Sequence, residues 1–181
     1  MQEWVRYEDT ISHSDGKYFS IIAFRIEADN REVPTWTQPL IKPHEKGIIA
    51  FIVKKINNVL HLLVQAKVEP GNFDVVEMAP TVQCLTGSYH DVPPNDRPPF
   101  LDYVLNAKPE QIWYSALQSE EGGRFFREQN LNLIIEADEL LDIQTPYGYI
   151  WMTINQIKEF IKYNNFVNVQ ARCLSSCFNL S

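Results

Sequence analysis

Long apolar runs, a surplus of positive charge and a secretory leader are all missing from this chain of 181 residues. No stretch approaches the roughly 20 apolar residues that a membrane-spanning helix needs. Residues 1–4 lack the basic and apolar regions of a secretory signal. The formal net charge of -7 would repel polyanions, although it leaves room for a small anionic ligand held by local cations. We therefore expect no membrane segment and no general binding of nucleic acid.

Cysteine is also scarce, with three residues in all. Cys173 and Cys177 are one helical turn apart, which favours neighbours on one core face over a disulfide. Cys84 has no adjacent histidine that would mark it as a nucleophile, so we interpret it as a small buried side chain. A reducing cytoplasm is the expected location.

Familiar cofactor motifs are absent as well. The chain contains neither the G-x-x-x-x-G-K-[ST] phosphate loop nor the dinucleotide pattern G-x-G-x-x-G. Its four histidines, His13, His44, His61 and His90, are scattered without metal-ligand spacing, which argues against zinc. His61 lies within an apolar run and is interpreted as structural. We expect no metal site.

What is present is enough apolar material for one sizeable core. Hydrophobic residues make up 45% of the chain and aromatic residues 12%, and the length suits a single domain over residues 1–181. Several apolar runs precede helical patterns at the C-terminus, an order that predicts an α+β fold. The expected strands cover residues 17–26, 47–56, 59–68, 75–78, 111–117, 131–137 and 149–152, and the expected helices cover residues 100–107, the stretch after 153, and 169–178.

The clearest local feature is a hairpin over residues 47–68 with its turn at Asn57 and Asn58. Thr153 and Gln156 fit a capping box that begins a C-terminal helix. Residues 34–39 are too rich in proline for a central strand, and residues 91–99 must form a loop. The segment through His13 is interpreted as a short polar stretch.

Polar side chains gather where the predicted strands end. They form three clusters and one isolated cation: Gln65, Lys67, Glu69 and Asn72; Thr81, Gln83, Tyr89 and His90; Gln118, Ser119, Glu120, Glu121 and Arg124; and Arg172. Together such groups offer cations for a diphosphate, amides for sugar hydroxyls, and a carboxylate or tyrosine for proton transfer. The alternative is an ordinary hairpin and solvated turns, which the pattern alone favours.

Six blocks of sequence resemble the signature of the NDP-hexose 2,3-dehydratases of deoxysugar biosynthesis. They occur in the family's order and cover nearly the whole chain: W-T-Q-P-L (36–40), Q-A-K-V-E-P-G-N (65–72), A-P-T-V-Q (79–83), Q-S-E-E-G-G-R-F (118–125), W-M-T (151–153) and N-V-Q-A-R (168–172). Six separate blocks are far more specific than a single short motif.

The resemblance implies a Nudix-like fold, in which helices flank a mixed β-sheet. The Nudix hydrolase box G-x5-E-x7-R-E-x-x-E-E-x-G is absent, so pyrophosphate cleavage is not expected. Family members usually carry two such units in tandem, whereas this chain holds one, closer in wording to the second. A single unit that pairs with itself as a homodimer would rebuild the tandem arrangement.

The chemistry implied by the family needs neither metal nor redox cofactor. The substrate would be a nucleotide-linked, typically dTDP-linked, 4-keto-6-deoxyhexose, whose C4 ketone acidifies the proton on C3. A base removes that proton, a donor or cation stabilises the enolate, and an acid helps the C2 hydroxyl to leave. The enol that forms tautomerises to the 3,4-diketo sugar.

Residue roles follow from the resemblance and from the polar clusters. Glu69 is expected to act as base or acid, Lys67 to stabilise the enolate or contact phosphate, and Tyr89 to be the acid partner. The expected substrate-binding residues are Trp36 for base stacking, Gln65 and Gln83 for sugar hydroxyls, Arg124 and Arg172 for the diphosphate, and Gln118 and Glu121 beside them. Each of these side chains has an alternative structural role, such as a cross-hairpin pair of Lys67 with Glu69.

The sequence leaves three classes of function open: an active dehydratase, a non-catalytic nucleotide-sugar binding unit or subunit, and a keto-sugar isomerase that uses the same enolate. All three share one geometric expectation. The strand ends around Lys67 and Glu69 should meet the bend at Gly122, Gly123 and Arg124 and form a cavity for a sugar diphosphate.

Overall fold

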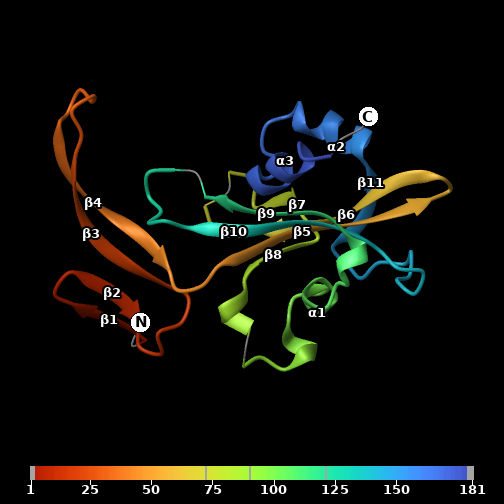
Figure 1. Cartoon of the computed structure of the whole chain (residues 1–181), viewed down its shortest axis with the longest axis horizontal. Helices are drawn as coiled ribbons and strands as arrows, with labels where there is room; N and C mark the ends of the chain where they lie inside the picture. Colours follow the sequence, from red (N-terminus) through yellow and green to blue (C-terminus); the bar gives the residue numbers. More distant parts are fainter. Residues whose placement is uncertain (1–2, 72, 90, 121, 179–181) are drawn as a thin grey trace. The chain divides into compact units, whose positions relative to one another are not determined.

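The computed structural model describes residues 3–71, 73–89, 91–120 and 122–178. The chain divides into two compact units. Unit 1 comprises Met1–Gly47, Leu85–Val92 and Leu117–Asn130, and unit 2 comprises Ile48–Cys84, Pro93–Ala116 and Leu131–Ser181. Figure 1 labels the strands and helices along the chain.

Unit 1 contains a four-stranded antiparallel sheet in the order β1-β2-β3-β4. Its strands are β1 (Trp4–Tyr7), β2 (Thr10–His13), β3 (Phe19–Glu27) and β4 (Thr35–Pro43). The expected strand over residues 17–26 is confirmed by β3. The proline-rich β4 lies at the sheet edge, where missing N–H donors are tolerated.

Two strands that were not predicted lie in the N-terminal segment. β1 and β2 form a hairpin in which Trp4 lies opposite His13, and β2 pairs with β3. The Trp4 ring packs against Phe19, with ring centroids 5.0 Å apart. Strands of four residues carry little periodicity, so β1 depends on pairing with β2, and β2 on pairing with β3, which the local sequence does not reveal.

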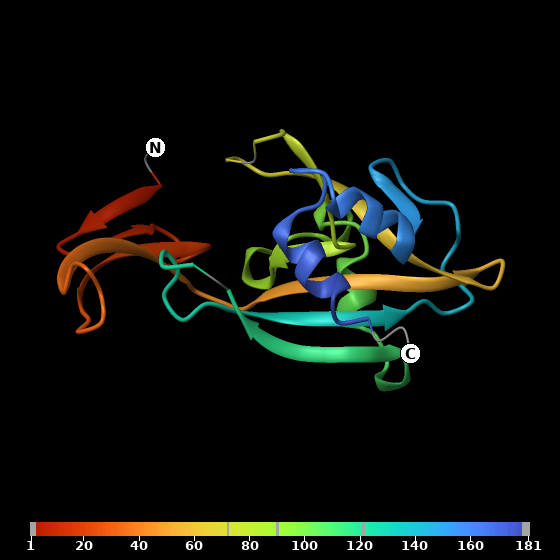
Figure 2. The same ribbon diagram turned by 90° about the horizontal axis from the view of Figure 1, so that it is seen from above.

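Unit 2 is built on a larger sheet in the order β11-β6-β5-β10-β9, with β7 paired to β6 and β8 paired to β5. Figure 2 shows β5, β10 and β9 side by side. The strands are β5 (Gly47–Ile56), β6 (Val59–Val68), β7 (Val76–Ala79), β8 (Val82–Leu85), β9 (Ile112–Ser119), β10 (Gln129–Glu136) and β11 (Tyr149–Thr153).

The predicted hairpin is confirmed residue for residue by β5 and β6. Asn57 and Asn58 both have positive φ, at 50° and 62°, as a two-residue hairpin turn requires. The other predicted strands of unit 2 are also confirmed within two residues at each end, whereas β8 was not predicted.

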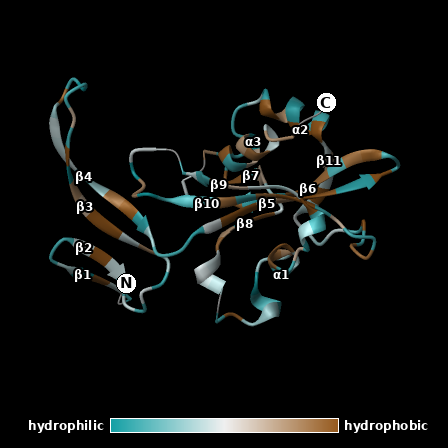
Figure 3. Ribbon diagram, in the orientation of Figure 1, coloured by the Kyte–Doolittle hydropathy of each residue, from teal (hydrophilic) through white to brown (hydrophobic). Residues whose placement is uncertain are grey.

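Helices cover both faces of this sheet, as Figure 1 shows, with α1 (Leu101–Leu105) on one side and α2 (Ile154–Ile161) and α3 (Val169–Ser175) on the other. The hydrophobic cluster joins Phe51 and Val64 of the sheet to Ile157 of α2 and Leu174 of α3. Figure 3 shows how β5 changes from hydrophobic to hydrophilic along its length. The expected α+β fold with C-terminal helices is therefore confirmed.

Side-chain caps at Thr153 and Asn168 determine where the two C-terminal helices begin. Thr153 accepts a hydrogen bond from the Gln156 backbone N–H, and the Gln156 side chain accepts one from the Thr153 backbone N–H, as predicted. One expectation about α3 was wrong: Cys173 is exposed, and only Cys177 packs on the core. Among the described residues, all three cysteines are free thiols.

Candidate functional site

Three of the predicted site residues lie at the end of β6, with Gln65 and Lys67 in the strand and Glu69 directly after it. Gln65, Lys67 and Glu69 are partly buried, whereas Ala66 and Val68 between them are exposed. Alternate residues of a strand point to the same side, so the side chains of Gln65, Lys67 and Glu69 share a surface. The Lys67 side chain is 22% exposed and that of Glu69 is 40% exposed, which leaves both accessible to a small molecule.

This surface lies where β6 separates from β5. The two strands pair from Ile56 and Val59 up to Val53 and Leu62. Beyond that point β6 pairs with β7, starting at Gln65 opposite Ala79, and β5 pairs with β8. The segment that links β7 to β8 therefore crosses from one strand of the hairpin to the other.

Thr81 fills the gap between the separating strands. Its hydroxyl accepts a hydrogen bond from the Ile52 backbone N–H at 2.9 Å and donates one to the Leu63 carbonyl. The residue is completely buried. Thr81 thereby replaces a hydrogen bond that the ladder loses, and it brings Gln83 on β8 alongside the end of β6.

A group of polar side chains, which we call the Glu69 cluster, consists of Gln65, Lys67, Glu69, Gln83 and Asn168, and contacts link the last four. The Lys67 ammonium donates to the Gln83 backbone carbonyl at 3.2 Å and lies 3.9 Å from a Glu69 carboxylate oxygen. The Gln83 side-chain NH2 lies 3.4 and 3.5 Å from the two Glu69 oxygens. The predicted pairing of Lys67 with Glu69 is thus part of a wider network.

The remaining members tie this cluster to its surroundings. Gln65 donates from its side chain to the Pro80 carbonyl at 2.8 Å. Asn168 caps α3 and donates to the Gln83 side-chain oxygen at 2.7 Å. The cluster joins a carboxylate, an ammonium group and amides, which are the groups that proton transfer and the binding of sugar hydroxyls require.

Two weak acids next to the cluster stay protonated at neutral pH. Burial raises the pKa of the Cys84 thiol to about 11, and the positive charge of Lys67 works against this rise. Burial, and secondly the Cys84 group, raise the pKa of Tyr149 to about 12. Tyr149 on β11 lies opposite Gln65 on β6, and the Tyr149 ring packs edge-on against Phe100. Both groups can therefore donate hydrogen bonds at this end of the sheet.

In unit 1, two of the sequence blocks come together. The Trp36 ring N–H donates to the Gln38 side chain at 2.7 Å, and Gln38 in turn donates to the Gly123 carbonyl. The Arg124 carbonyl accepts from the Ile41 backbone N–H at 2.7 Å, which holds the bend against β4. The Arg124 guanidinium lies over the Phe125 ring, 5.1 Å from its centroid.

The other predicted site residues occupy separate places. Tyr89 ends the 3-10 turn Thr86–Tyr89, and Gln118 lies on β9, both in unit 1 and both partly buried. Arg172 is exposed on α3 in unit 2. Three residues of the predicted clusters, Asn72, His90 and Glu121, lie outside the described residues.

The structure thus gathers Gln65, Lys67, Glu69 and Gln83 in unit 2, and it holds Trp36 and Arg124 near one another in unit 1. The expected meeting of the Glu69 region with the Gly122–Arg124 bend concerns residues of both units and stays a prediction.

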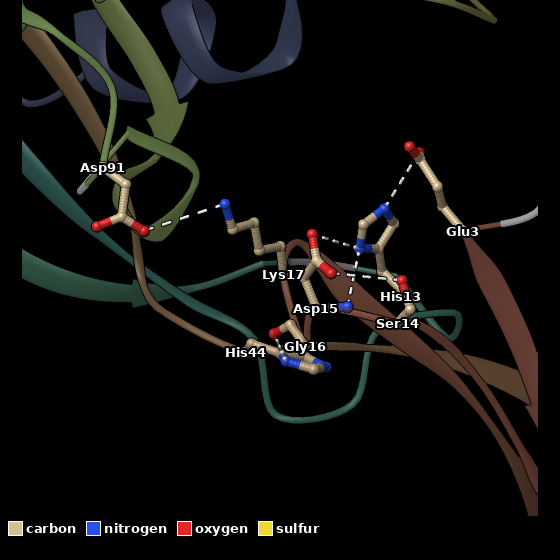
Figure 4. A network of polar contacts seen from close by, with 8 residues as sticks. All are labelled: Glu3, His13, Ser14, Asp15, Gly16, Lys17, His44 and Asp91. Carbon is tan, nitrogen blue, oxygen red and sulfur yellow. Dashed lines mark hydrogen bonds and ion pairs between the residues drawn. The ribbon is translucent and has the colours of Figure 1, made fainter.

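Unit 1 also carries a polar network around two histidines, shown in Figure 4. His44 contacts the Gly16 carbonyl and the Ser20 hydroxyl, each at 2.6 Å. His13 accepts from the Asp15 backbone N–H at 3.3 Å and lies 3.4 Å from Glu3. A cavity of about 270 Å³ opens beside His44 and Lys17. Within the described residues, no group of three or more His, Cys, Asp or Glu side chains is arranged to hold a metal ion.

Thr81, Tyr149 and Asn168 belong to the candidate site; Thr81 was placed in a polar cluster without a role, and Tyr149 and Asn168 were missed in the sequence. Thr81 and Asn168 lie in the quoted blocks A-P-T-V-Q and N-V-Q-A-R, so the signal existed for these two. Tyr149 could have been found by pairing β11 with β6, since it then lies opposite Gln65.

The chain matches known proteins along almost its full length. Residues 1–178 match the family described as NDP-hexose 2,3-dehydratase. The chain is 49% identical over 174 residues to a dTDP-4-dehydro-6-deoxy-alpha-D-glucopyranose 2,3-dehydratase of Saccharopolyspora spinosa, covering 96% of this chain and 36% of that protein. It is 46% identical over 176 residues to a protein of the same name from Amycolatopsis orientalis, covering 97% and 37%. The chain therefore spans little more than a third of the length of these curated relatives.

Solved structures of hydrolases are also similar. The Nudix hydrolase RenU of M. smegmatis matches with a TM-score of 0.47 and 13% identity, covering 84% of this chain and 91% of that one. An ADP compounds hydrolase matches with a TM-score of 0.48 and 10% identity, covering 87% and 83%. Among the described residues, no helix combines the length and apolar character needed to cross a bilayer.

Proposed function

Because the chain belongs to the NDP-hexose 2,3-dehydratase family, we propose that it removes water across C2 and C3 of a dTDP-4-keto-6-deoxyhexose. The product is the 3,4-diketo sugar of a deoxysugar pathway. The observation that carries this proposal is the family match over residues 1–178. The relatives named as dehydratases are nearly three times as long, so their activity is extended to this shorter chain as a proposal.

In this proposal Glu69 is the base that takes the C3 proton. The electron pair of the C3–H bond moves to the C4 oxygen as an enolate, and the C2–O bond then breaks and releases water. Glu69 suits this role because its carboxylate is accessible and lies beside the donors of Gln83 and Lys67. Those donors orient the carboxylate while leaving lone pairs free for the substrate proton.

Lys67 is the proposed stabiliser of the enolate. An ammonium group has three N–H donors, and one of those of Lys67 is directed at the Gln83 carbonyl. The remaining donors are available to the C4 oxygen as negative charge develops on it. A proton must also reach the departing C2 hydroxyl, and we propose Tyr89 for this step.

The substrate-binding roles follow the family blocks. We propose Gln65 and Gln83 for sugar hydroxyls, Trp36 for stacking on the base, Arg124 and Arg172 for the diphosphate, and Gln118 and Glu121 as further substrate-binding residues. Arg124 and Arg172 suit their role because they are exposed cations in a chain of net negative charge.

We further propose that the protein works as a homodimer in the cytoplasm. Two copies of this chain related by C2 symmetry would restore the tandem arrangement of the family, and light scattering measures the mass of such a pair directly. A strict monomer that turns over substrate would overturn the pairing idea. The free thiols of the described residues suit a reducing compartment.

A second candidate function is a nucleotide-sugar binding unit without catalysis. The observation in its favour is coverage, because this chain corresponds to 36% of the Saccharopolyspora relative. A third candidate, an isomerase, would use the same enolate and return the proton to carbon instead of releasing water.

The test mixes the pure protein with dTDP-4-keto-6-deoxyglucose and follows the release of dTDP from the unstable product. We expect turnover by the wild type and a loss of about 10²- to 10⁴-fold in kcat for Glu69→Gln, because general-base catalysis is removed. Lys67→Met should lose a similar amount. Lys162→Met is the matched control, because Lys162 is an exposed lysine paired with Glu159 on α2.

The results separate the three candidates. Tight binding without turnover favours the binding unit, and conversion to a stable isomer favours the isomerase. Undiminished dTDP release by Glu69→Gln would refute the assigned base.

A further inference from the structure

Asn168 is a buried amide whose orientation is dictated by the helix that follows it. The residue is 4% exposed and is the N-cap of α3. Its side chain makes one contact with the Ala171 backbone nitrogen at 2.8 Å and another with the Gln83 side chain at 2.7 Å. It therefore connects the start of a helix to the Glu69 cluster.

The donor and the acceptor of each hydrogen bond in this connection can be assigned without ambiguity. The Ala171 backbone N–H can only donate, so the Asn168 atom that faces it must be the carbonyl oxygen. The Asn168 NH2 group then faces Gln83, which must present its side-chain oxygen. The Gln83 NH2 group is consequently turned toward the Glu69 carboxylate.

We propose that Asn168 is a positioning residue for Glu69 that acts through the Gln83 amide. The inference rests on the proposed function insofar as Glu69 is the base. Without the Asn168 donor, Gln83 is free to rotate by half a turn and present its oxygen to the carboxylate. Two acceptors would then face each other, and Glu69 would lose the hydrogen bond that orients it.

The cluster offers a way to disturb this orientation alone. Lys67 is held by the backbone carbonyl of Gln83, which does not depend on the Gln83 side chain. The main chain at Asn168 is held by its own N–H, which donates to the Met78 carbonyl at 2.9 Å. A change confined to the Asn168 side chain therefore leaves both attachments in place.

Asn168→Asp is the informative variant. Aspartate caps a helix as well as asparagine does, so the start of α3 is retained. Its carboxylate has no donor for Gln83, and the Gln83 NH2 group should turn toward the new carboxylate. We expect kcat to fall about tenfold while KM changes less than about threefold, since one oriented hydrogen bond to the base is lost.

Two controls separate positioning from other effects. Asn155→Asp makes the same chemical change at an exposed position of α2 and should leave kcat unchanged. In a Gln83→Met background, Asn168→Asp should lower kcat less than about twofold. A structural defect, or a long-range effect of the new charge, would persist in that background and would overturn the inference.

An activity-free measurement closes the test. In the wild type, the Gln83 side-chain NH2 protons should show nuclear Overhauser contacts to the Glu69 γ-protons, and in Asn168→Asp to the β-protons of residue 168. Retained contacts to Glu69 in the variant would refute the positioning role. If the wild type shows no turnover, the dehydratase proposal fails, and these NMR signals still decide the orientation of Gln83.

Discussion

At the scale of single residues, the shared face at the end of β6 could be predicted, whereas the contact of Asn168 with Gln83 could not. The alternation of Gln65, Lys67 and Glu69 follows from the two-residue period of a strand, so one shared face is implied by the sequence. The contact of Asn168 with Gln83 joins residues 85 positions apart. A local sequence pattern cannot relate residues so far apart, so only the packing of α3 against the sheet reveals this contact.

The Cys84 thiol should react unusually slowly with alkylating reagents. Burial raises its pKa from 9.0 to about 11, so below pH 9 its thiolate fraction is about 100-fold lower than that of an ordinary cysteine. Iodoacetamide labelling followed by peptide mass spectrometry across pH 7–11 measures the rate. The rate at Cys84 should still be rising at pH 10.

The exposed Cys173 is the internal reference for this experiment. Lys67→Met should slow the labelling of Cys84 further, because the lysine charge lowers the pKa of the thiol. The same shift has a consequence for stability. The Cys84 thiol stays protonated to a higher pH in the folded state than in the unfolded state. Its contribution to the free energy of unfolding is therefore present below about pH 9 and is lost as the pH rises toward 11. Equal labelling rates at Cys84 and Cys173 at pH 8 would contradict the assigned burial.

At the scale of elements, strands with strong apolar runs were predicted and strands that depend on partners were not. The hairpin β5–β6 carries its signal locally, in two apolar runs and an Asn57–Asn58 turn. β1, β2 and β8 are each four residues long. In these three segments neither periodicity nor composition indicates a strand, and pairing with a neighbour decides the outcome.

The separation of β5 from β6 makes Thr81 a critical residue for stability. Thr81→Val keeps the shape of the side chain but leaves the buried Ile52 N–H and Leu63 C=O without their partner. We expect the free energy of unfolding to fall by about 2–4 kcal/mol, since each buried unsatisfied group costs about 1–3 kcal/mol. Urea denaturation followed by tryptophan fluorescence measures the change.

Thr81→Ser is the matched control for this prediction. Serine keeps the hydroxyl that bridges the two strands and removes one buried methyl group, which should cost about 1 kcal/mol. The two variants therefore separate the hydrogen bonds from the packing. A valine variant that is no less stable than the serine variant would show that the hydroxyl does not hold the strands.

At the scale of the whole molecule, the buried apolar residues are distributed unevenly between the units. Of the described residues, the only buried hydrophobic side chain of unit 1 is Leu40, whereas unit 2 contains the whole hydrophobic cluster. The strands of unit 1 instead bury polar groups such as His13 and Ser20. The family match covers both units.

This distribution predicts that the two units differ in local stability. Ala50–Val53 of β5 and Leu62–Val64 of β6 are almost completely buried, whereas β3 and β4 are largely exposed or half-buried along their length. Amides in β5 and β6 should therefore exchange with deuterium at least about tenfold more slowly than those in β3 and β4, because opening them requires unfolding of the hydrophobic cluster. Hydrogen–deuterium exchange resolved by peptide mass spectrometry makes the comparison within one sample. Equal protection in β3 and β5 would mean that unit 1 opens only together with the core of unit 2.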